Sequence, residues 1–153
     1  MEMGDEGFVE VRIASVDGVI GAGKSHLLRD LRAVGREDLF IFVEPSTRSN
    51  KMLALFYTDP ARYGAAMQFY ILAMRLQIMI EVYRTALAHP GATLIVERCF
   101  PADMVFVLAN FRLGYFPLAG LSDYMHLMHE ILETLPLPSA FFVLEVSSDE
   151  AVR

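Results

Sequence analysis

The sequence predicts an α/β fold in three layers, with a parallel sheet between helices, and two observations carry this prediction. Four apolar, β-branched runs typical of strands alternate with helical patterns along the chain, which is the order that βαβ units produce. The 153 residues are 54% hydrophobic, as expected of a parallel sheet that is covered on both faces. That length fits a single domain over residues 1–153.

The strands are expected where apolar residues with high β-propensity cluster between turn signals. These runs cover Val9–Val16, Leu39–Val43, Thr93–Val96 and Ala140–Val146.

The helices follow from end signals and from the spacing of apolar residues. The longest is predicted over Pro60–Ala88, because Asp59 suits the N-cap, Pro60 suits the first helical position, and the segment 89–91 reads His-Pro-Gly. Shorter helices are expected over His26–Arg32, Ala102–Arg112 and Ser122–Leu135, with Leu113–Gly120 as a connector and a new helix beginning near Ser148.

The segment between the first strand and the first helix fits the pattern G-x-x-x-x-G-K-[ST] of a phosphate-binding loop. Its residues are Gly18, Val19, Ile20, Gly21, Ala22, Gly23, Lys24 and Ser25. A strand, a glycine turn and a helix N-terminus point backbone N–H groups at one spot and so form an anion site. Lys24 can reach the terminal phosphates and Ser25 can ligate magnesium, so we expect a phosphate-loop NTPase fold that binds a nucleoside triphosphate.

Composition excludes some partners. A net charge of −6 argues against nucleic acid, because binding its backbone needs clustered Lys and Arg. No apolar run approaches the roughly 18–20 residues of a membrane span, so no membrane partner is expected. The N-terminus, with Glu2, Asp5 and Glu6, does not resemble a signal or transit peptide. Cys99 is the single cysteine and fits a reducing compartment, so we expect a cytoplasmic location, with a mitochondrial one left open.

Glu44 directly follows the second expected strand and precedes Pro45. Open α/β sheets place their sites at the carboxyl ends of the strands, so this carboxylate should lie near the phosphate-binding loop. There it could accept a proton from an attacking hydroxyl. The alternative is a solvated acid in a turn that ends the strand.

Glu97 and Arg98 directly follow the third expected strand. Glu97 could position a magnesium ion or its waters, and Arg98 could clamp a phosphoryl group through bidentate hydrogen bonds. A plain surface ion pair is the alternative.

Gln68 and Arg75 share one face of the longest helix, because they stand seven residues apart in a nearly apolar stretch. A buried amide and a buried guanidinium need partners, since each unsatisfied polar group costs about 1–3 kcal/mol. The partner is either a protein group such as Asp103 or a flat polar ligand such as a nucleobase, and periodicity does not choose between them.

Taken in order, these motifs resemble the deoxynucleoside kinase family, in particular its deoxycytidine, deoxyguanosine and deoxyadenosine branch. The motifs are the loop from Asp17 to Ser25, Glu44-Pro45, the segment 56–60 with Tyr57, Gln68 with Arg75, and Glu97-Arg98 with Asp103. The resemblance extends over essentially the whole chain.

The resemblance implies transfer of the γ-phosphate of ATP, with Mg²⁺, to the 5′-hydroxyl of a deoxynucleoside. It implies that Glu44 is the general base, that Tyr57 bonds the sugar 3′-hydroxyl, and that Gln68 pairs with the base edge. Arg98 would lie near the transferred phosphoryl group, with Glu97 beside the magnesium. Arg75 and Asp103 would occupy the space of a thymine methyl group, so deoxycytidine or a purine deoxynucleoside is expected to be preferred over thymidine.

Length and composition depart from this family. The sequence ends at Arg153, so the resemblance predicts that the arginine-rich lid and the last strand are missing and that the domain is incomplete. There is no tryptophan after Glu44, and Val107 stands where an aromatic residue is expected. A second hypothesis is therefore a lid-less nucleotide-binding or dimerisation module without turnover. A homodimer is compatible with either hypothesis.

Overall fold

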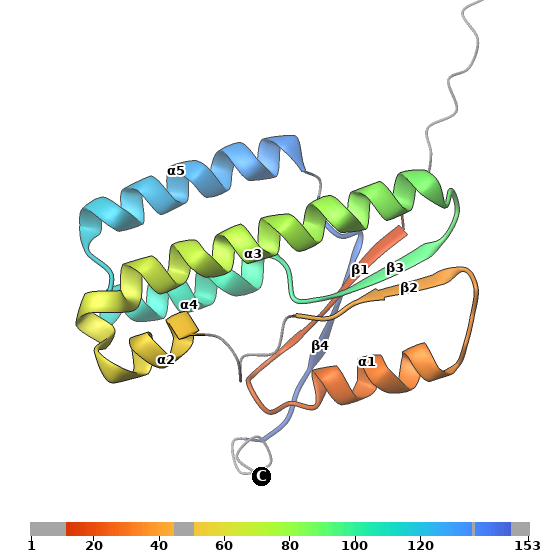
Figure 1. The fold of residues 1–153 in the computed structure, drawn as a ribbon, viewed down its shortest axis with the longest axis horizontal. Helices are drawn as coiled ribbons and strands as arrows, with labels where there is room; N and C mark the ends of the chain where they lie inside the picture. The colour runs from red at the N-terminus through yellow and green to blue at the C-terminus, as the bar shows by residue number, and fades with distance from the viewer. Residues whose placement is uncertain (1–11, 45–50, 136, 148–153) are drawn as a thin grey trace, which may run out of the picture.

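The computed structural model describes residues 12–44, 51–135 and 137–147. Within them, four strands form one sheet whose strand pairs are all parallel (Figure 1). The strands are β1 (Arg12–Gly18), β2 (Leu39–Phe42), β3 (Thr93–Glu97) and β4 (Ala140–Leu144), in the spatial order β2-β3-β1-β4. The predicted parallel α/β sheet is confirmed.

Five helices of the described chain surround this sheet. They are α1 (Lys24–Ala33), α2 (Lys51–Thr58), α3 (Pro60–Ala88), α4 (Phe100–Arg112) and α5 (Leu118–Thr134). α1 lies on one side of the sheet, while α3, α4 and α5 lie on the other, so the fold has three layers (Figure 1).

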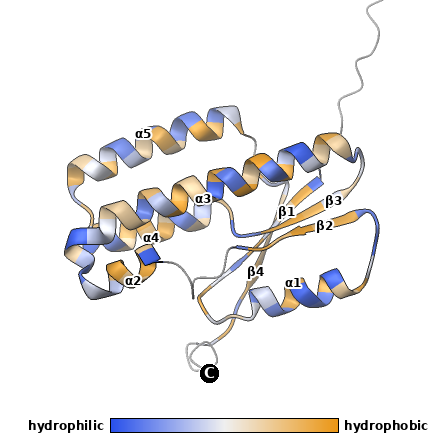
Figure 2. Ribbon diagram, viewed as in Figure 1, coloured by the Kyte–Doolittle hydropathy of each residue, from blue (hydrophilic) through white to orange (hydrophobic). Residues whose placement is uncertain are grey.

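The core lies between the sheet and the α3–α5 layer. Strand residues Ile13, Leu94 and Val96 pack there with residues of all three helices. The helix residues of this core are Leu72, Met79, Val82, Ala86, Phe100, Val107, Tyr124, Met128 and Ile131. Figure 2 shows hydrophobic residues along the strands and a mixture of hydrophobic and hydrophilic residues on the helices.

α3 begins and ends where the sequence predicts, at Pro60 and Ala88. The Asp59 carboxylate accepts a hydrogen bond from the Arg62 N–H and so caps the helix, as expected of an N-cap aspartate. By length and composition α3 is apolar enough to cross a membrane, contrary to the expectation from the sequence. This is weak support for a membrane, because core helices meet the same criterion, and Leu72 and Met79 of α3 lie in the core.

Strand ends differ from the prediction for a physical reason. β1 continues to Gly18 because Asp17 and Gly18 pair with Val143 and Leu144 of β4. β4 ends at Leu144, and not at Val146, where this pairing stops. β3 likewise extends to Glu97, which pairs with β1. β2 ends at Phe42, one residue early, where its pairing with β3 stops.

Several helix starts were predicted too late. α1 begins at Lys24, inside the phosphate-binding loop, and α4 begins at Phe100, directly after Cys99. α5 begins at Leu118, so the end of the expected connector is helical, and Pro117 before it has the extended backbone of an N-cap residue. α2 is not among the expected helices. The segments 9–11 and 148–153, with the predicted start of the first strand and the cap at Ser148, lie outside the described residues.

Candidate active site

The phosphate-binding loop joins β1 to α1 at the carboxyl end of the sheet. Gly21 and Gly23 adopt φ values of 84° and 86°, which favour glycine, and these turns bring the chain round to the start of α1. Gly23 is the N-cap of α1, and no side chain caps the helix. No described side chain therefore occupies the first N–H groups of α1, which fits the anion site expected at this loop.

Lys24 lies within this loop and is 5% exposed. Its Nζ donates to the carbonyl oxygens of Gly18 at 3.0 Å and Val19 at 2.7 Å. Burial, followed by the nearby Arg98 guanidinium, lowers the pKa of Lys24, while Glu97 and other carboxylates act against this shift. The structure thus places the ammonium group at the loop, on backbone carbonyls.

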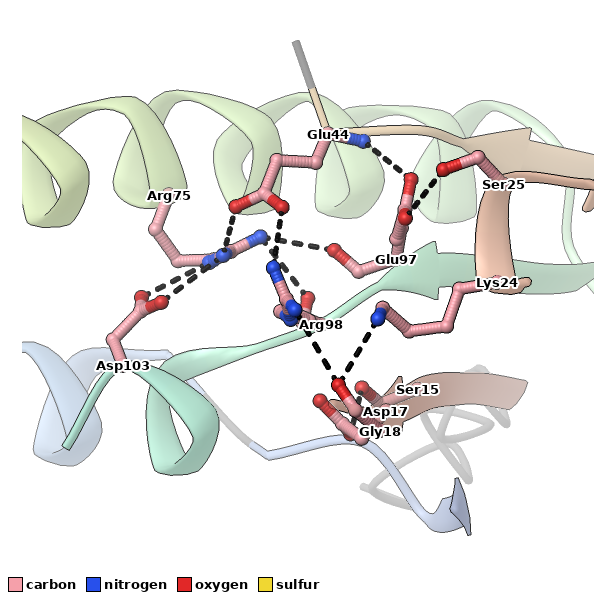
Figure 3. Close-up of polar contacts among 10 residues, drawn as sticks. All are labelled: Ser15, Asp17, Gly18, Lys24, Ser25, Glu44, Arg75, Glu97, Arg98 and Asp103. Atoms are coloured by element: carbon pink, nitrogen blue, oxygen red, sulfur yellow. Dashed lines mark hydrogen bonds and ion pairs between the residues drawn. The ribbon is translucent and has the colours of Figure 1, made fainter. Parts of the chain in front are cut away.

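Glu97 joins the loop to the end of β2 (Figure 3). Its Oε1 accepts a hydrogen bond from the Ser25 hydroxyl at 2.8 Å, and its Oε2 accepts one from the Glu44 N–H at 3.2 Å. Ser25 and Glu97 are therefore in contact although they are 72 residues apart in the sequence.

Glu44 lies between two guanidinium groups (Figure 3). Its Oε1 accepts from Arg75 Nη2 at 2.8 Å, and its Oε2 accepts from Arg98 Nη1 at 2.9 Å. The side chain is 24% exposed, so Glu44 is not a fully solvated acid in a turn. Pro45, which follows it in the sequence motif, lies outside the described residues.

Arg98 is the one non-glycine residue of the described chain with a left-handed backbone, at φ 62°. Its Nη2 donates to the carbonyl oxygen of Gly18 at 3.3 Å, so Arg98 and Lys24 share this acceptor. Its guanidinium lies 5.5 Å from the centre of the Phe106 ring. Phe106 was assigned no role from the sequence, although it stands three residues after Asp103 and so shares its helix face.

Arg75 is paired with Asp103 in the interior, and their side chains are 1% and 2% exposed. Nε and Nη2 of Arg75 each lie 3.0 Å from one carboxylate oxygen of Asp103. Burial acts to lower the pKa of Arg75, but the carboxylates of Asp103 and Glu44 outweigh it and raise that pKa. Burial raises the pKa of Asp103, and Arg75 acts against this shift. Of the partners left open for Arg75, the structure shows the protein carboxylate.

Within the described part of the chain, no hydrogen bond or ion pair joins Gln68 or Tyr57 to this network. Gln68 is 3% exposed, and its Oε1 is buried without a hydrogen-bond partner among the described residues. Tyr57 on α2 is 69% exposed, and its ring contacts that of Phe56. The structure thus joins Glu44, Arg75, Glu97, Arg98 and Asp103 by hydrogen bonds, with Lys24 and Ser25 bound at the loop beside them.

A second polar group lies at the end of β1, where Ser15 is buried and Asp17 is half-buried. The Ser15 hydroxyl donates to Asp17 Oδ2 at 2.6 Å, while Asp17 Oδ1 has no partner among the described residues. Cys99 is fully buried, and burial raises its pKa to about 12. Its thiol is therefore protonated at neutral pH and does not act as a nucleophile.

The residues present fit a magnesium ion held together with phosphate oxygens. Mg²⁺ prefers hard oxygen ligands and often binds through one or two protein oxygens plus substrate phosphates. The Ser25 hydroxyl and the Glu97 carboxylate supply such oxygens at the loop. Within the described ranges, no group of three or more His, Cys, Asp or Glu side chains is arranged so that it could hold a metal ion by itself.

The fold has three layers around one parallel sheet. The phosphate-binding loop and a cluster of carboxylates and guanidinium groups lie at the carboxyl end of this sheet. These features define a nucleotide-binding protein of the phosphate-loop class. The family model for deoxynucleoside kinase matches residues 14–153. The chain therefore belongs to the deoxynucleoside kinase family.

Two curated relatives are deoxyguanosine kinases. The one from Dictyostelium discoideum is 27% identical over 145 residues, which cover 93% of this chain and 48% of the relative. The one from Lactobacillus acidophilus (strain ATCC 700396 / NCK56 / N2 / NCFM) is 28% identical over 144 residues, which cover 90% of this chain and 59% of the relative. The chain spans about half the length of the curated relatives it matches.

Proposed function

We propose that the protein transfers the γ-phosphate of ATP to the 5′-hydroxyl of a deoxynucleoside. Family membership supports nucleoside phosphorylation in general. The observation that carries the specific reaction is the position of Glu44, whose carboxylate projects from the end of β2 between Arg75 and Arg98. A carboxylate beside a phosphate-binding loop can accept the proton that a hydroxyl loses as it attacks a phosphoryl group.

The neighbouring residues would stabilise charge, hold magnesium and bind the sugar. Lys24 and Arg98 both donate to the Gly18 carbonyl, so two cations converge where the phosphates would lie. They would stabilise the negative charge on the transferred group. Ser25 and Glu97 would hold Mg²⁺, which neutralises charge on the phosphates when bound. For Tyr57 we propose a bond to the sugar 3′-hydroxyl, on the family resemblance alone.

For the base, we propose a preference for a purine deoxynucleoside or deoxycytidine over thymidine. Gln68 supports recognition of a base in general, because a buried acceptor that has no partner among the described residues is suited to a ligand that donates a hydrogen bond. The Asp103–Arg75 pair supports this preference, since a rigid ionic pair resists displacement by a methyl group. Two relatives named deoxyguanosine kinase favour the purine. A competition assay in which thymidine outcompetes deoxyguanosine and deoxycytidine would contradict this preference.

Replacement of Glu44, the proposed general base, tests the reaction. In a chain that shows turnover, Glu44→Gln should lower kcat by about 10²–10⁴-fold, the usual contribution of general-base catalysis. The affinity for deoxynucleoside, measured by calorimetry, should change little, because the amide keeps the shape of the side chain.

Glu130→Gln is the matched control, since Glu130 is an exposed acid on α5, and it should leave kcat unchanged. If Glu44→Gln retains kcat within a few-fold, Glu44 is not the general base. If the unmodified chain binds nucleotide without turnover, the lid-less binding module is the better description. Outside the reaction itself, we propose a cytoplasmic location, with a mitochondrial one as the alternative, on the strength of the single cysteine, Cys99. A homodimer is compatible with the proposed function.

A further inference from the structure

The Arg98 side chain contacts an aromatic ring as well as hydrogen-bond acceptors. Its guanidinium carbon lies 5.5 Å from the centre of the Phe106 ring, within the distance of about 6 Å at which an aromatic face attracts a cation. Phe106 is half-buried on α4, whereas the next residue, Val107, is fully buried in the core. Of these two adjacent apolar side chains, the valine therefore packs in the core and the phenylalanine contacts the site.

Hydrogen bonds to protein use only part of the Arg98 guanidinium, which carries five N–H donors. Nη1 donates to Glu44 at 2.9 Å and Nη2 donates to the carbonyl oxygen of Gly18 at 3.3 Å (Figure 3). The other donors have no partner among the described residues, although the side chain is only 12% exposed. A largely buried guanidinium with unused donors is suited to an anionic group with several oxygens, such as a phosphoryl group.

The Phe106 ring restrains this guanidinium without using a donor. The negative face of the ring attracts the cation, and this attraction adds no net charge to the site. A carboxylate at this position would accept hydrogen bonds from Arg98 and neutralise its charge. The ring therefore leaves both the donors and the positive charge of Arg98 for a ligand.

The ring itself is held on a rigid element. Phe106 lies one helical turn after the buried Asp103, and its carbonyl oxygen accepts a hydrogen bond from Asn110 Nδ2 at 2.9 Å. Arg98, in contrast, has a long side chain that loses much rotamer freedom when it is ordered. A contact that orders this side chain before the ligand binds reduces the entropy lost on binding.

We propose that Phe106 is a positioning residue for phosphoryl transfer, whose ring holds the Arg98 guanidinium beside the phosphate-binding loop. The proposal rests on the proposed function of Arg98 at this site. In this role Phe106 acts through Arg98 and does not itself contact the transferred group.

Phe106→Leu is the informative replacement, because leucine keeps an apolar side chain and removes the ring face. In a chain that shows turnover, kcat should fall by about 3–30-fold, the range expected for loss of a cation–π contact. The fall should be equal for deoxyguanosine and deoxycytidine, with the Kd of each within about threefold of the wild-type value. Phe106→Tyr keeps a ring face and should retain kcat within about twofold.

Phe111→Leu is the matched control, since Phe111 is another partly buried phenylalanine of α4 and packs against the core. It should leave kcat within about twofold, because Phe111 is not in contact with Arg98. An equal fall of kcat in Phe111→Leu and Phe106→Leu would indicate a general effect of α4 packing and would overturn the proposal.

A double-variant comparison shows whether Phe106 acts through Arg98. Arg98→Gln removes the guanidinium charge, so Phe106→Leu should lower kcat by a smaller factor in this background than in the wild-type chain. Equal factors in both backgrounds would overturn the proposal. So would a Phe106→Leu variant with unchanged kcat and a nucleoside Kd raised more than tenfold, which would indicate that the ring stacks on the base.

A measurement on the wild-type chain needs neither turnover nor a folded variant. The ring current of Phe106 should shift the side-chain NMR signals of Arg98 away from those of Arg84, an exposed arginine on α3. Arg98 signals that coincide with those of Arg84 would overturn the proposal whether or not the chain is active. Absence of nucleoside binding and of turnover in the wild-type chain, with shifted Arg98 signals, would instead contradict the proposed function.

Discussion

Arg98 illustrates how single residues build this site. A left-handed backbone costs a non-glycine residue roughly 1–2 kcal/mol, yet this conformation lets Arg98 act in three directions. Its N–H donates to Val16 of β1, its carbonyl accepts from Arg75, and its guanidinium reaches Glu44. The hydrogen bonds and the Phe106 ring offset the backbone strain.

Lys24 carries a prediction at this scale. Lys24→Ala removes an ammonium group that lies on the loop carbonyls beside the proposed phosphate position. A hydrogen bond to a charged group contributes about 1.5–3 kcal/mol, so ATP affinity measured by calorimetry should fall at least about tenfold. Lys51→Ala, which replaces the other lysine of the sequence, should leave ATP affinity unchanged. An unchanged ATP affinity in Lys24→Ala would contradict the proposal that the phosphate-binding loop binds ATP.

At the level of elements, α3 carries two of the candidate site residues, Gln68 and Arg75. Gln68 and Arg75 lie on its buried face together with Leu72 and Met79, while Asp59 caps its start. α3 must approach its neighbours closely to place these side chains. Gly64 permits this approach, because a Cβ atom there would lie 2.2 Å from the carbonyl oxygen of Tyr115.

Gly64→Ala should therefore destabilise the protein, although alanine favours helices. Forcing a methyl group into a packed interface costs typically about 1–3 kcal/mol of unfolding free energy, which denaturant titration can measure. Gly120→Ala on α5 is the matched control, since its nearest neighbours would lie 3.6–3.8 Å from the new Cβ atom. The control should be neutral or slightly stabilising. A higher free energy of unfolding in Gly64→Ala would contradict this prediction and would show that α3 and Tyr115 can move apart at little cost.

On the scale of the whole molecule, β4 leaves apolar surface at the edge of the sheet. Phe141, Phe142 and Val143 are 47%, 58% and 64% exposed, and among the described residues β4 pairs on one side only, with β1. Edge strands with exposed apolar side chains can pair with other chains. The loop and the cluster of charges lie at the same, carboxyl, end of this sheet, where Gly18 pairs with Leu144.

The 153-residue chain should consequently self-associate as its concentration rises. Phe142→Lys should reduce this association, because a charge on an edge strand opposes pairing with a second edge. Sedimentation velocity over a range of concentrations measures the effect. Leu127→Lys on α5 replaces a residue that is 43% exposed on a helix, and it should have a smaller effect. Equal behaviour of both variants would exclude the β4 edge as the cause.

Local patterns in the sequence determined the strands, the phosphate-binding loop and the bounds of α3. Such features depend on neighbouring residues: a proline and an aspartate begin α3, and glycines permit the loop turns. The positions of Glu44 and Glu97-Arg98 near the loop were also predictable, because parallel strands end at the same edge of a sheet. α2 and the start of α5 were not, since packing against α3 and an extended Pro117 decide them.

Only the tertiary structure decided which charged groups meet. Arg75 contacts Asp103 and Glu44, which are 28 and 31 residues away, and Arg98 contacts Glu44 across 54 residues. The sequence showed that Arg75 needed partners and could not choose between a protein carboxylate and a nucleobase. Strand order, register and the approach of α3 to α4 set these contacts, and they depend on the packing of the whole chain, which no short segment of the sequence contains.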